Sequence, residues 1–134
     1  NNMTFDDFEN LSNKWKTGAE YISLFPNVLL GVHRDHTIAI VLQPLSTDKT
    51  LERIEIHYAS SNSASNKYKS MRKRNRALWN DVFKEDIFVV EGMQKGRQGI
   101  FFDGGKFSPI MDSPTHIFHH WVASNLKKNG EMET

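Results

Sequence analysis

Apolar and polar residues alternate at every second position over residues 51–59, in the clearest pattern of the chain. The apolar side of this segment consists of Ile54, Ile56 and Tyr58. Such alternation predicts a β-strand that buries one face. Two further apolar segments precede it, residues 36–43 and residues 21–33, and Pro26 marks a bend or bulge within the latter. The three segments together predict an antiparallel meander with one solvent-exposed face.

A helical spacing of apolar residues replaces this alternation further along the chain. It predicts a long helix over residues 66–83, whose inner stripe would contain Tyr68, Met71, Leu78 and Val82. A second helix is expected to begin near Asp86 and to end near Gly96, because three glycines weaken its latter part. A shorter helix is predicted over residues 4–17. Ser113 as N-cap and Pro114 predict the start of a terminal helix.

Strands followed by helices predict an α+β fold, in which an antiparallel sheet packs against a long helix. Residues 100–102 are expected to form a short strand before a hairpin turn. We divide the chain into an N-terminal helical segment (1–19), a main domain (20–126) and a tail (127–134) that is expected to be frayed from Lys127 on.

Composition narrows the possible functions. The chain has 134 residues, of which 38% are hydrophobic and 25% charged, and its net charge is +1. It has no cysteine, which excludes disulfides, thiolate zinc sites and an iron–sulfur cluster of its own. It also has no apolar stretch long enough to span a bilayer and no signal-peptide pattern. We therefore predict a soluble, cytoplasmic protein without membrane or nucleic-acid partners. The basic run over residues 67–76 is interpreted as a solvated helix face rather than a phosphate-binding surface.

Asp86 is the most informative polar residue. At helical spacing it shares a face with Val89, Val90 and Met93. A carboxylate on an apolar face must be paired, must cap a helix, or must bind a metal, since burying it unpaired costs too much. The spacing alone favours capping, because Asp near a helix N-terminus is stabilised without any further function.

Histidines form two clusters that could bind a metal. His33 and His36 flank a short turn, and His57 lies on a later predicted strand. His116 and His120 have the helical spacing of paired zinc ligands, but Glu does not follow the first of them. We interpret both clusters as structural or surface residues.

Three blocks of sequence, taken together, resemble one family. They are Phe25–His36 followed by Pro44 and Thr50–Arg53, Trp79–Gly96 with its Glu85-Asp86 pair and Gln94, and Phe107–Pro109 through Phe118–Trp121. Their order and spacing are similar to the C-terminal catalytic portion of the alpha subunit of Rieske-type non-haem iron oxygenases, the ring-hydroxylating and quaternary-ammonium-oxidising group. The resemblance covers about residues 20–126.

The resemblance implies a helix-grip fold and a mononuclear Fe(II) held by two histidines and one aspartate, which maps onto Asp86. The family's Asp-x-x-His-x-x-x-x-His motif and its Rieske cluster (2Fe–2S) ligands have no counterpart here, and the chain begins with Asn1. We therefore expect a part of such an enzyme, inactive on its own, with the Rieske cluster in a preceding part. The implied partners are an organic substrate that becomes hydroxylated, dioxygen, a reductase component and further copies of the chain, a trimer when intact.

A substrate pocket is predicted between the sheet and the helices. Its expected lining is Leu29, Gly31, Val89, Val90 and Met93. Incomplete cover of this apolar surface would favour self-association. Two alternatives stay open, namely a non-catalytic helix-grip domain that binds an apolar small ligand, and an interaction domain that works through its basic helix.

Overall fold

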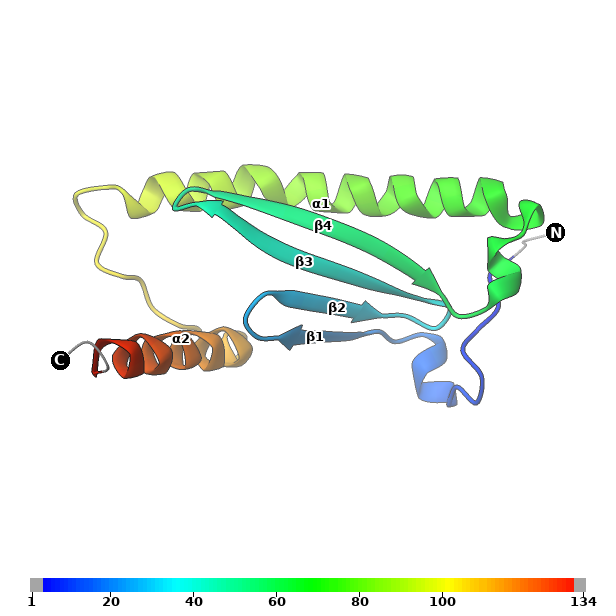
Figure 1. Ribbon diagram of the computed structural model, residues 1–134, viewed down its shortest axis with the longest axis horizontal. Helices are drawn as coiled ribbons and strands as arrows, with labels where there is room; N and C mark the ends of the chain where they lie inside the picture. The colour runs from blue at the N-terminus through cyan, green and yellow to red at the C-terminus, as the bar shows by residue number, and fades with distance from the viewer. Residues whose placement is uncertain (1–3, 132–134) are drawn as a thin grey trace. The chain divides into compact units, whose positions relative to one another are not determined.

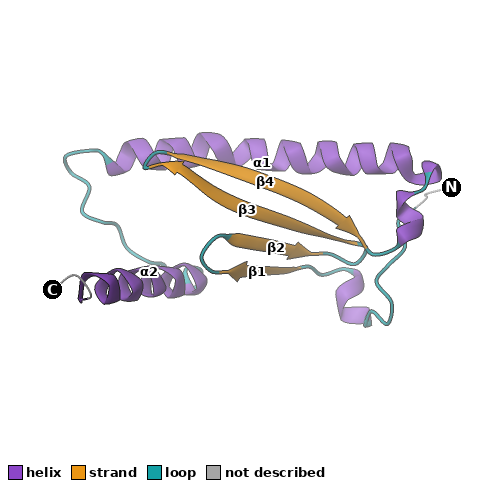
Figure 2. Cartoon of the chain, in the orientation of Figure 1, coloured by secondary structure: helices purple, strands orange, loops and turns teal. Residues whose placement is uncertain are grey.

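A computed structural model describes residues 4–131. Its sheet is an antiparallel meander with the strand order β1-β2-β3-β4 (Figure 1, Figure 2). The strands are β1 (Glu20–Leu24), β2 (Val28–Val32), β3 (His36–Ser46) and β4 (Lys49–Tyr58). The predicted α+β fold, an antiparallel sheet together with a long helix, is confirmed.

The first predicted strand is in fact two strands. Leu24 pairs with Val28, so the chain reverses around Pro26 where a bend within one strand was predicted. Proline has no N–H for a strand ladder and therefore favours a turn here. The Asn27 side chain then donates a hydrogen bond to the Leu42 carbonyl oxygen at 3.0 Å, which ties the turn to β3.

The predicted alternation along β4 is confirmed. Ile54, Ile56 and Tyr58 are half-buried, and the residues between them are exposed. Ile38 of β3 pairs with Ile56 and is buried. β3 runs further than predicted, to Ser46, with an irregularity in its pairing near that end. The face of the sheet that carries Ile38, Ile54 and Ile56 therefore provides the apolar contacts toward α1.

Helix α1 (Lys69–Arg97) is a single helix of 29 residues, so the prediction of two helices was wrong. Lys84 and Glu85 join the two predicted segments, and both are good helix formers. Asp86 consequently lies in the interior of a helix and caps none. The predicted end near Gly96 is confirmed within one residue. Two short 3₁₀ helices, η2 (Ser61–Ala64) and η3 (Asn66–Tyr68), precede α1.

The inner stripe of α1 differs from the prediction. Leu78 and Val82 are 60% and 38% exposed. The residues that contact the sheet side follow a four-residue step, namely Met71, Asn75, Trp79 and Phe83. The predicted Tyr68 and Met71 are buried, and they form a small core with Phe5, against which Tyr58 packs. The prediction placed Leu78 on the inner stripe because leucine is strongly apolar. In the structure the neighbouring Trp79 takes this place and donates a hydrogen bond to His36.

The N-terminal segment is mostly not helical, which corrects the helix predicted over residues 4–17. Only the 3₁₀ helix η1 (Asn13–Lys16) forms there. The Phe5 ring instead lies 4.5 Å from that of Tyr58, and the Phe8 N–H donates a hydrogen bond to the Arg34 carbonyl oxygen at 2.8 Å. Contacts with the sheet have overridden the local helical pattern.

The chain divides into two compact units, the second of which begins at Lys95. This unit contains helix α2 (Ser113–Glu131), which confirms the predicted terminal helix. The expected strand at residues 100–102 is absent, because a turn stands there. Within the unit, the Phe107 ring lies 5.1 Å from each of the rings of His116 and His119. The expected frayed tail is helical through Glu131, and its last residues lie outside the described ones. The three predicted segments of the chain stay predictions.

Candidate functional site

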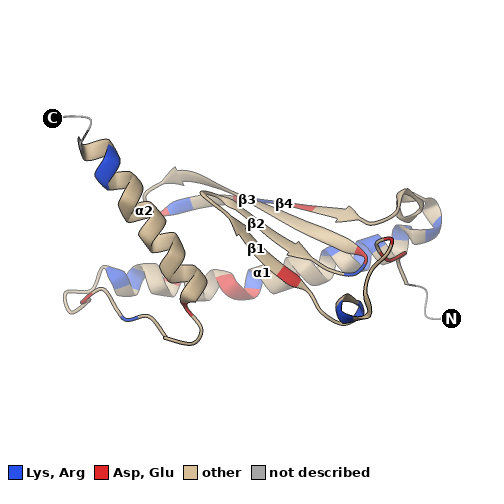
Figure 3. Ribbon diagram, turned by 90° about the horizontal axis from the view of Figure 1, so that it is seen from below, with Lys and Arg blue, Asp and Glu red and all other residues tan. Residues whose placement is uncertain are grey.

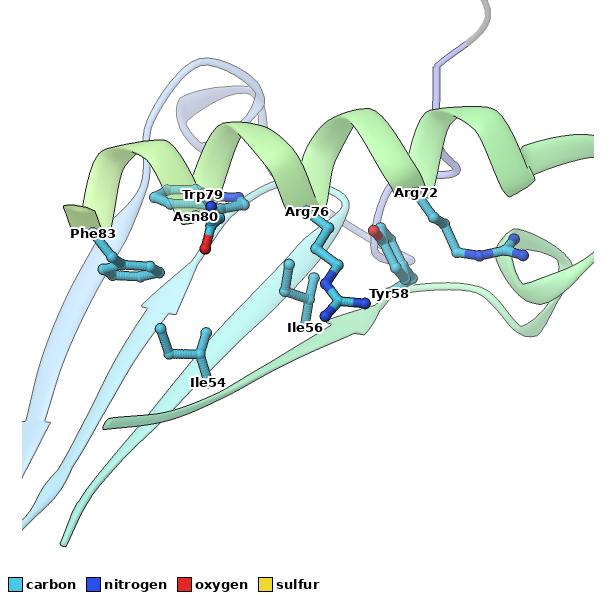
Figure 4. Close-up of a pocket in the computed structure, with 8 residues that line it drawn as sticks. All are labelled: Ile54, Ile56, Tyr58, Arg72, Arg76, Trp79, Asn80 and Phe83. Carbon is cyan, nitrogen blue, oxygen red and sulfur yellow. The ribbon is translucent and has the colours of Figure 1, made fainter. Parts of the chain in front are cut away.

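A cavity of about 410 Å³ lies between β4 and the first half of α1 (Figure 4). It is lined by Ile54, Ile56, Tyr58, Arg72, Arg76, Trp79, Asn80 and Phe83. The volume falls in the range of small-molecule sites, which typically combine apolar walls with a few polar groups.

Two neighbouring elements produce this lining. Every second residue of β4 faces α1, so its apolar side forms one wall. Arg72, Arg76 and Asn80 follow each other at four-residue steps, one position on from the stripe that contacts the sheet, and form the opposite wall. The cavity exists because this second stripe carries long polar side chains where close packing would need compact apolar ones.

The two arginines play different parts. Arg72 donates hydrogen bonds to the carbonyl oxygens of Ser63 and Ser65, the latter at 2.8 Å, which fastens the 3₁₀ turns to α1. Figure 4 shows the Arg72 side chain turned away from the strands, whereas Arg76 extends toward β4 between Ile56 and Tyr58. Arg76 makes no ion pair with any carboxylate in the described residues. Its guanidinium is therefore available to a ligand.

The basic run is only in part the solvated face that was predicted. Figure 3 shows basic residues along the early turns of α1. Lys69, Lys73 and Arg74 are exposed, in agreement with the prediction. Arg72 and Arg76 differ from these residues because they line the cavity; Arg72 is half-buried, whereas Arg76 is exposed.

A histidine and a tryptophan anchor α1 beside the cavity. The Trp79 indole N–H donates to His36 Nε2 at 3.1 Å, so this nitrogen carries no proton. His36 Nδ1 therefore carries the ring proton and donates a hydrogen bond to Asp35 Oδ1 at 2.6 Å. The Asp35 carboxylate thus fixes the His36 tautomer whose Nε2 can accept the hydrogen bond from Trp79.

His33 completes this cluster. Its ring stacks on that of His36 at 4.8 Å. Burial lowers the pKa of His33, and His36 lowers it further, although Asp35 opposes the shift. The pKa of Asp35 is also lowered: burial raises it, but the hydrogen bond from His36 and nearby positive charge outweigh that effect. His33 Nε2 is buried and has no hydrogen-bond partner among residues 4–131, which favours the neutral ring.

The predicted iron ligand, Asp86, is exposed in the interior of α1. It lies three residues after Phe83 and seven after Trp79, so it continues the stripe of α1 that faces the sheet. The predicted lining residues Val89, Val90 and Met93 are also exposed, at 54%, 63% and 54%. None of these four residues lines the cavity beside β4.

The two predicted lining residues of β2 differ from each other. Leu29 is 36% exposed, and Gly31 is buried. A Cβ added at Gly31 would come 3.2 Å from Tyr21 Cε1. The Tyr21 ring therefore lies close to this glycine, and the contribution of Gly31 to a substrate pocket stays a prediction.

The cavity residues were missed in the sequence for a definable reason. Their common signal is the four-residue step Arg72, Arg76, Asn80, which lies within the predicted helix 66–83. It was overlooked because the inner stripe was assigned to Leu78 and Val82 and the basic residues were interpreted as a solvated face. The alternation of β4 had already placed its apolar side correctly.

The sheet, the helix laid along it and the cavity between them define an α+β domain of the helix-grip kind that was expected. The sequence model of one family, described as ring hydroxylating alpha subunit (catalytic domain), matches residues 2–128. The match spans nearly the whole chain, and the chain therefore belongs to this family of Rieske-type oxygenase subunits. No curated protein and no solved structure shows a significant match.

The family implies iron, but the residues described here do not form an iron site by themselves. Among residues 4–131 no three His, Asp or Glu side chains come together as a metal site would require. His33 and His36 stack on one side of the sheet, and His57 instead lies 3.3 Å from Glu55 Oε2. Within the same range, neither helix is long and apolar enough to cross a membrane.

Proposed function

We propose that this chain is the C-terminal part of an oxygenase catalytic domain that hydroxylates an organic substrate at a mononuclear Fe(II). Asp86 would supply one carboxylate ligand, and the remaining ligands would come from outside the described residues. Leu29, Gly31, Val89, Val90 and Met93 would contribute to the substrate pocket. A Rieske cluster, a reductase component and a homo-oligomeric, trimeric assembly belong to the same proposal.

The observation that carries the proposal is the position of Asp86 within the matched region. It follows Trp79 and Phe83 on one stripe of α1, and both of these lie beside the cavity. A ligand bound there would extend along the helix toward the carboxylate. The exposed apolar residues beyond Asp86 favour a further protein surface as cover, in agreement with assembly.

The test is to replace Asp86 with Ala in the protein expressed from its complete reading frame. We expect loss of bound iron and a fall in turnover of at least about a hundredfold, with the fold retained, because a facial triad has only three protein ligands. Iron content, turnover and circular dichroism measure the three effects. Asp81→Ala, on another side of the same helix, is the matched control. Full iron and activity in Asp86→Ala would exclude the assignment.

A second candidate function is the binding of an apolar small molecule without redox chemistry. A separate cavity of about 510 Å³ favours it. This cavity lies between the N-terminal segment and the sheet, lined by Phe8, Leu11, Trp15, Gly18, Glu20, Ile22, Val32, His33 and Thr37. The complete protein distinguishes the two functions, since a binding domain would hold no iron and consume no dioxygen.

A further inference from the structure

We propose that the cavity between β4 and α1 binds an organic anion, an aryl carboxylate of one or two rings, and that Arg76 recognises its carboxylate. The binding itself does not depend on iron; only the identification of this anion as the substrate rests on the proposed function. Of two possible ligand types, an organic acid and a quaternary ammonium compound, the proposal thereby selects the organic acid.

The first argument is the charge of the cavity. Its eight lining residues include two arginines and no carboxylate. Residues 66–80, which contain the helical part of the lining except Phe83, have no Asp or Glu, and Asp81 follows directly but does not line the cavity. Arg72 is engaged by backbone carbonyls, but Arg76 has no carboxylate partner in the described chain. A guanidinium presents paired N–H donors that match a carboxylate.

The second argument is a hydroxyl beside Arg76. The Asn75 side chain donates a hydrogen bond to the Tyr58 hydroxyl oxygen at 3.3 Å. This occupies the oxygen as an acceptor and leaves the O–H proton without an acceptor among the described residues. Figure 4 shows Tyr58 and Arg76 side by side at one end of the cavity. Together they offer an anion donors from two elements.

The third argument is the apolar remainder of the lining. Ile54, Trp79 and Phe83 lie further along the cavity, away from the Tyr58 end. Aromatic faces accept the flat ring of a ligand. They would also attract a quaternary ammonium group, but two guanidinium groups in the same cavity oppose a cation. The lining therefore fits a ring attached to a negative group.

This arrangement gives the ligand a direction. Arg76 precedes Asp86 by ten residues, which is about 15 Å along a helix. A carboxylate held at Arg76 places the ring beside Trp79 and Phe83, on the side that leads toward Asp86. Arg76 would thus be a specificity-determining residue and would take no part in the chemistry at Asp86.

Equilibrium binding to the full chain tests the proposal, with isothermal calorimetry and three probes of matched shape. The probes are 2-naphthoate, the neutral 2-naphthamide, and the cation (2-naphthylmethyl)trimethylammonium. We expect 2-naphthoate to bind about ten- to a hundredfold more tightly than the amide, the usual worth of a hydrogen bond to a charged group. The cation should bind more weakly than either.

Variants locate the site. Arg76→Gln should reduce the affinity for 2-naphthoate to that for the amide, and Arg76→Lys should retain part of the preference. Tyr58→Phe should cost about two- to tenfold. Arg74→Gln removes the same charge from an exposed position of α1 outside the cavity and should leave binding unchanged.

Four outcomes would overturn the proposal: no binding of 2-naphthoate, equal binding of acid and amide, tighter binding of the cation, or an equal loss in Arg74→Gln and Arg76→Gln. Iron content is measured separately, on Asp86→Ala. Failure of the anion site and failure of the proposed function are therefore distinguishable.

Discussion

The two halves of α1 differ both in sequence character and in their surroundings, since the first half carries the basic residues and the second half carries the apolar run Ile87–Val90. In the first half, Met71 packs into the core and Trp79 donates a hydrogen bond to His36. In the second half, Ile87, Phe88 and Val90 are 53%, 83% and 63% exposed. A helix that is apolar on several sides is normally buried. The first half of α1 is thus stabilised by contacts with the rest of this chain. The second half presents an exposed apolar surface that suits contact with another protein surface.

The contacts that position α1 lie in its first half, whereas Asp86, the proposed metal ligand, lies in its second half. The contacts of Trp79 and Met71 fix the first half, so the cavity beside them is preformed. Asp86 and the residues after it lie on a part of the helix without such contacts among the described residues. A carboxylate ligand there would be positioned only when the rest of the site is present.

The largest expected effect comes from removing the anchor of the first half. Trp79→Ala deletes a half-buried ring and its hydrogen bond to His36. We expect the free energy of unfolding to fall by about 2–3 kcal/mol, somewhat less than for a fully buried tryptophan. Urea unfolding followed by circular dichroism measures it.

Phe88→Ala is the matched change in the second half, at a side chain that is 83% exposed. It should alter the free energy of unfolding by no more than about 0.5 kcal/mol. An equal loss in both variants would show that the second half is covered in solution, and the contrast between the halves would then fail.

How far the sequence predicts the fold depends on whether a local pattern decides the structure. The alternation of Ile54, Ile56 and Tyr58 placed β4 and its buried face correctly, because a strand next to a helix must bury one side. The C-terminal end of α1 and the start of α2 were also close to the prediction, since glycine and proline act locally.

The misplaced elements are those in which distant contacts decide. The residues around Phe5 have a helical pattern, but the Phe5 ring packs against those of Tyr58 and Tyr68, and the segment is irregular. No local pattern indicates that contact. Likewise, the role of Arg76 follows from the strand opposite it, which only the folded chain supplies. Asp86 was selected through the family resemblance, and its role as a ligand stays a prediction.

A smaller effect is expected from pH, at the histidine cluster that contacts Trp79 in the first half of α1. The pKa of His33 is lowered from its ordinary value of 6.5, so the unfolded chain binds more protons near that pH and stability rises with pH. The contribution is full above pH 6.5 and is lost as the pH falls below this value. Asp35, whose pKa is lowered from 3.8, adds a second loss below pH 3.8.

Urea midpoints between pH 7.5 and 5.5 measure the first of these losses. His33→Gln should flatten the dependence, and His116→Gln, in the other compact unit, should leave it in place. An unchanged slope in His33→Gln would show that the proton is bound elsewhere.

The smallest expected effect tests whether the second half of α1 is helical without its partner. Gly92 lies in this half, and a Cβ added there meets nothing within 4 Å. Gly92→Ala should therefore raise the free energy of unfolding by about 0.5–1 kcal/mol through helix propensity alone. Gly104→Ala is the control, since this glycine has φ +94° in an irregular segment and an alanine there should destabilise the chain. Thermal unfolding measures both variants. If Gly92→Ala has no effect while Gly104→Ala destabilises, the second half forms no helix in the free chain, because helix propensity can stabilise only residues that become helical on folding.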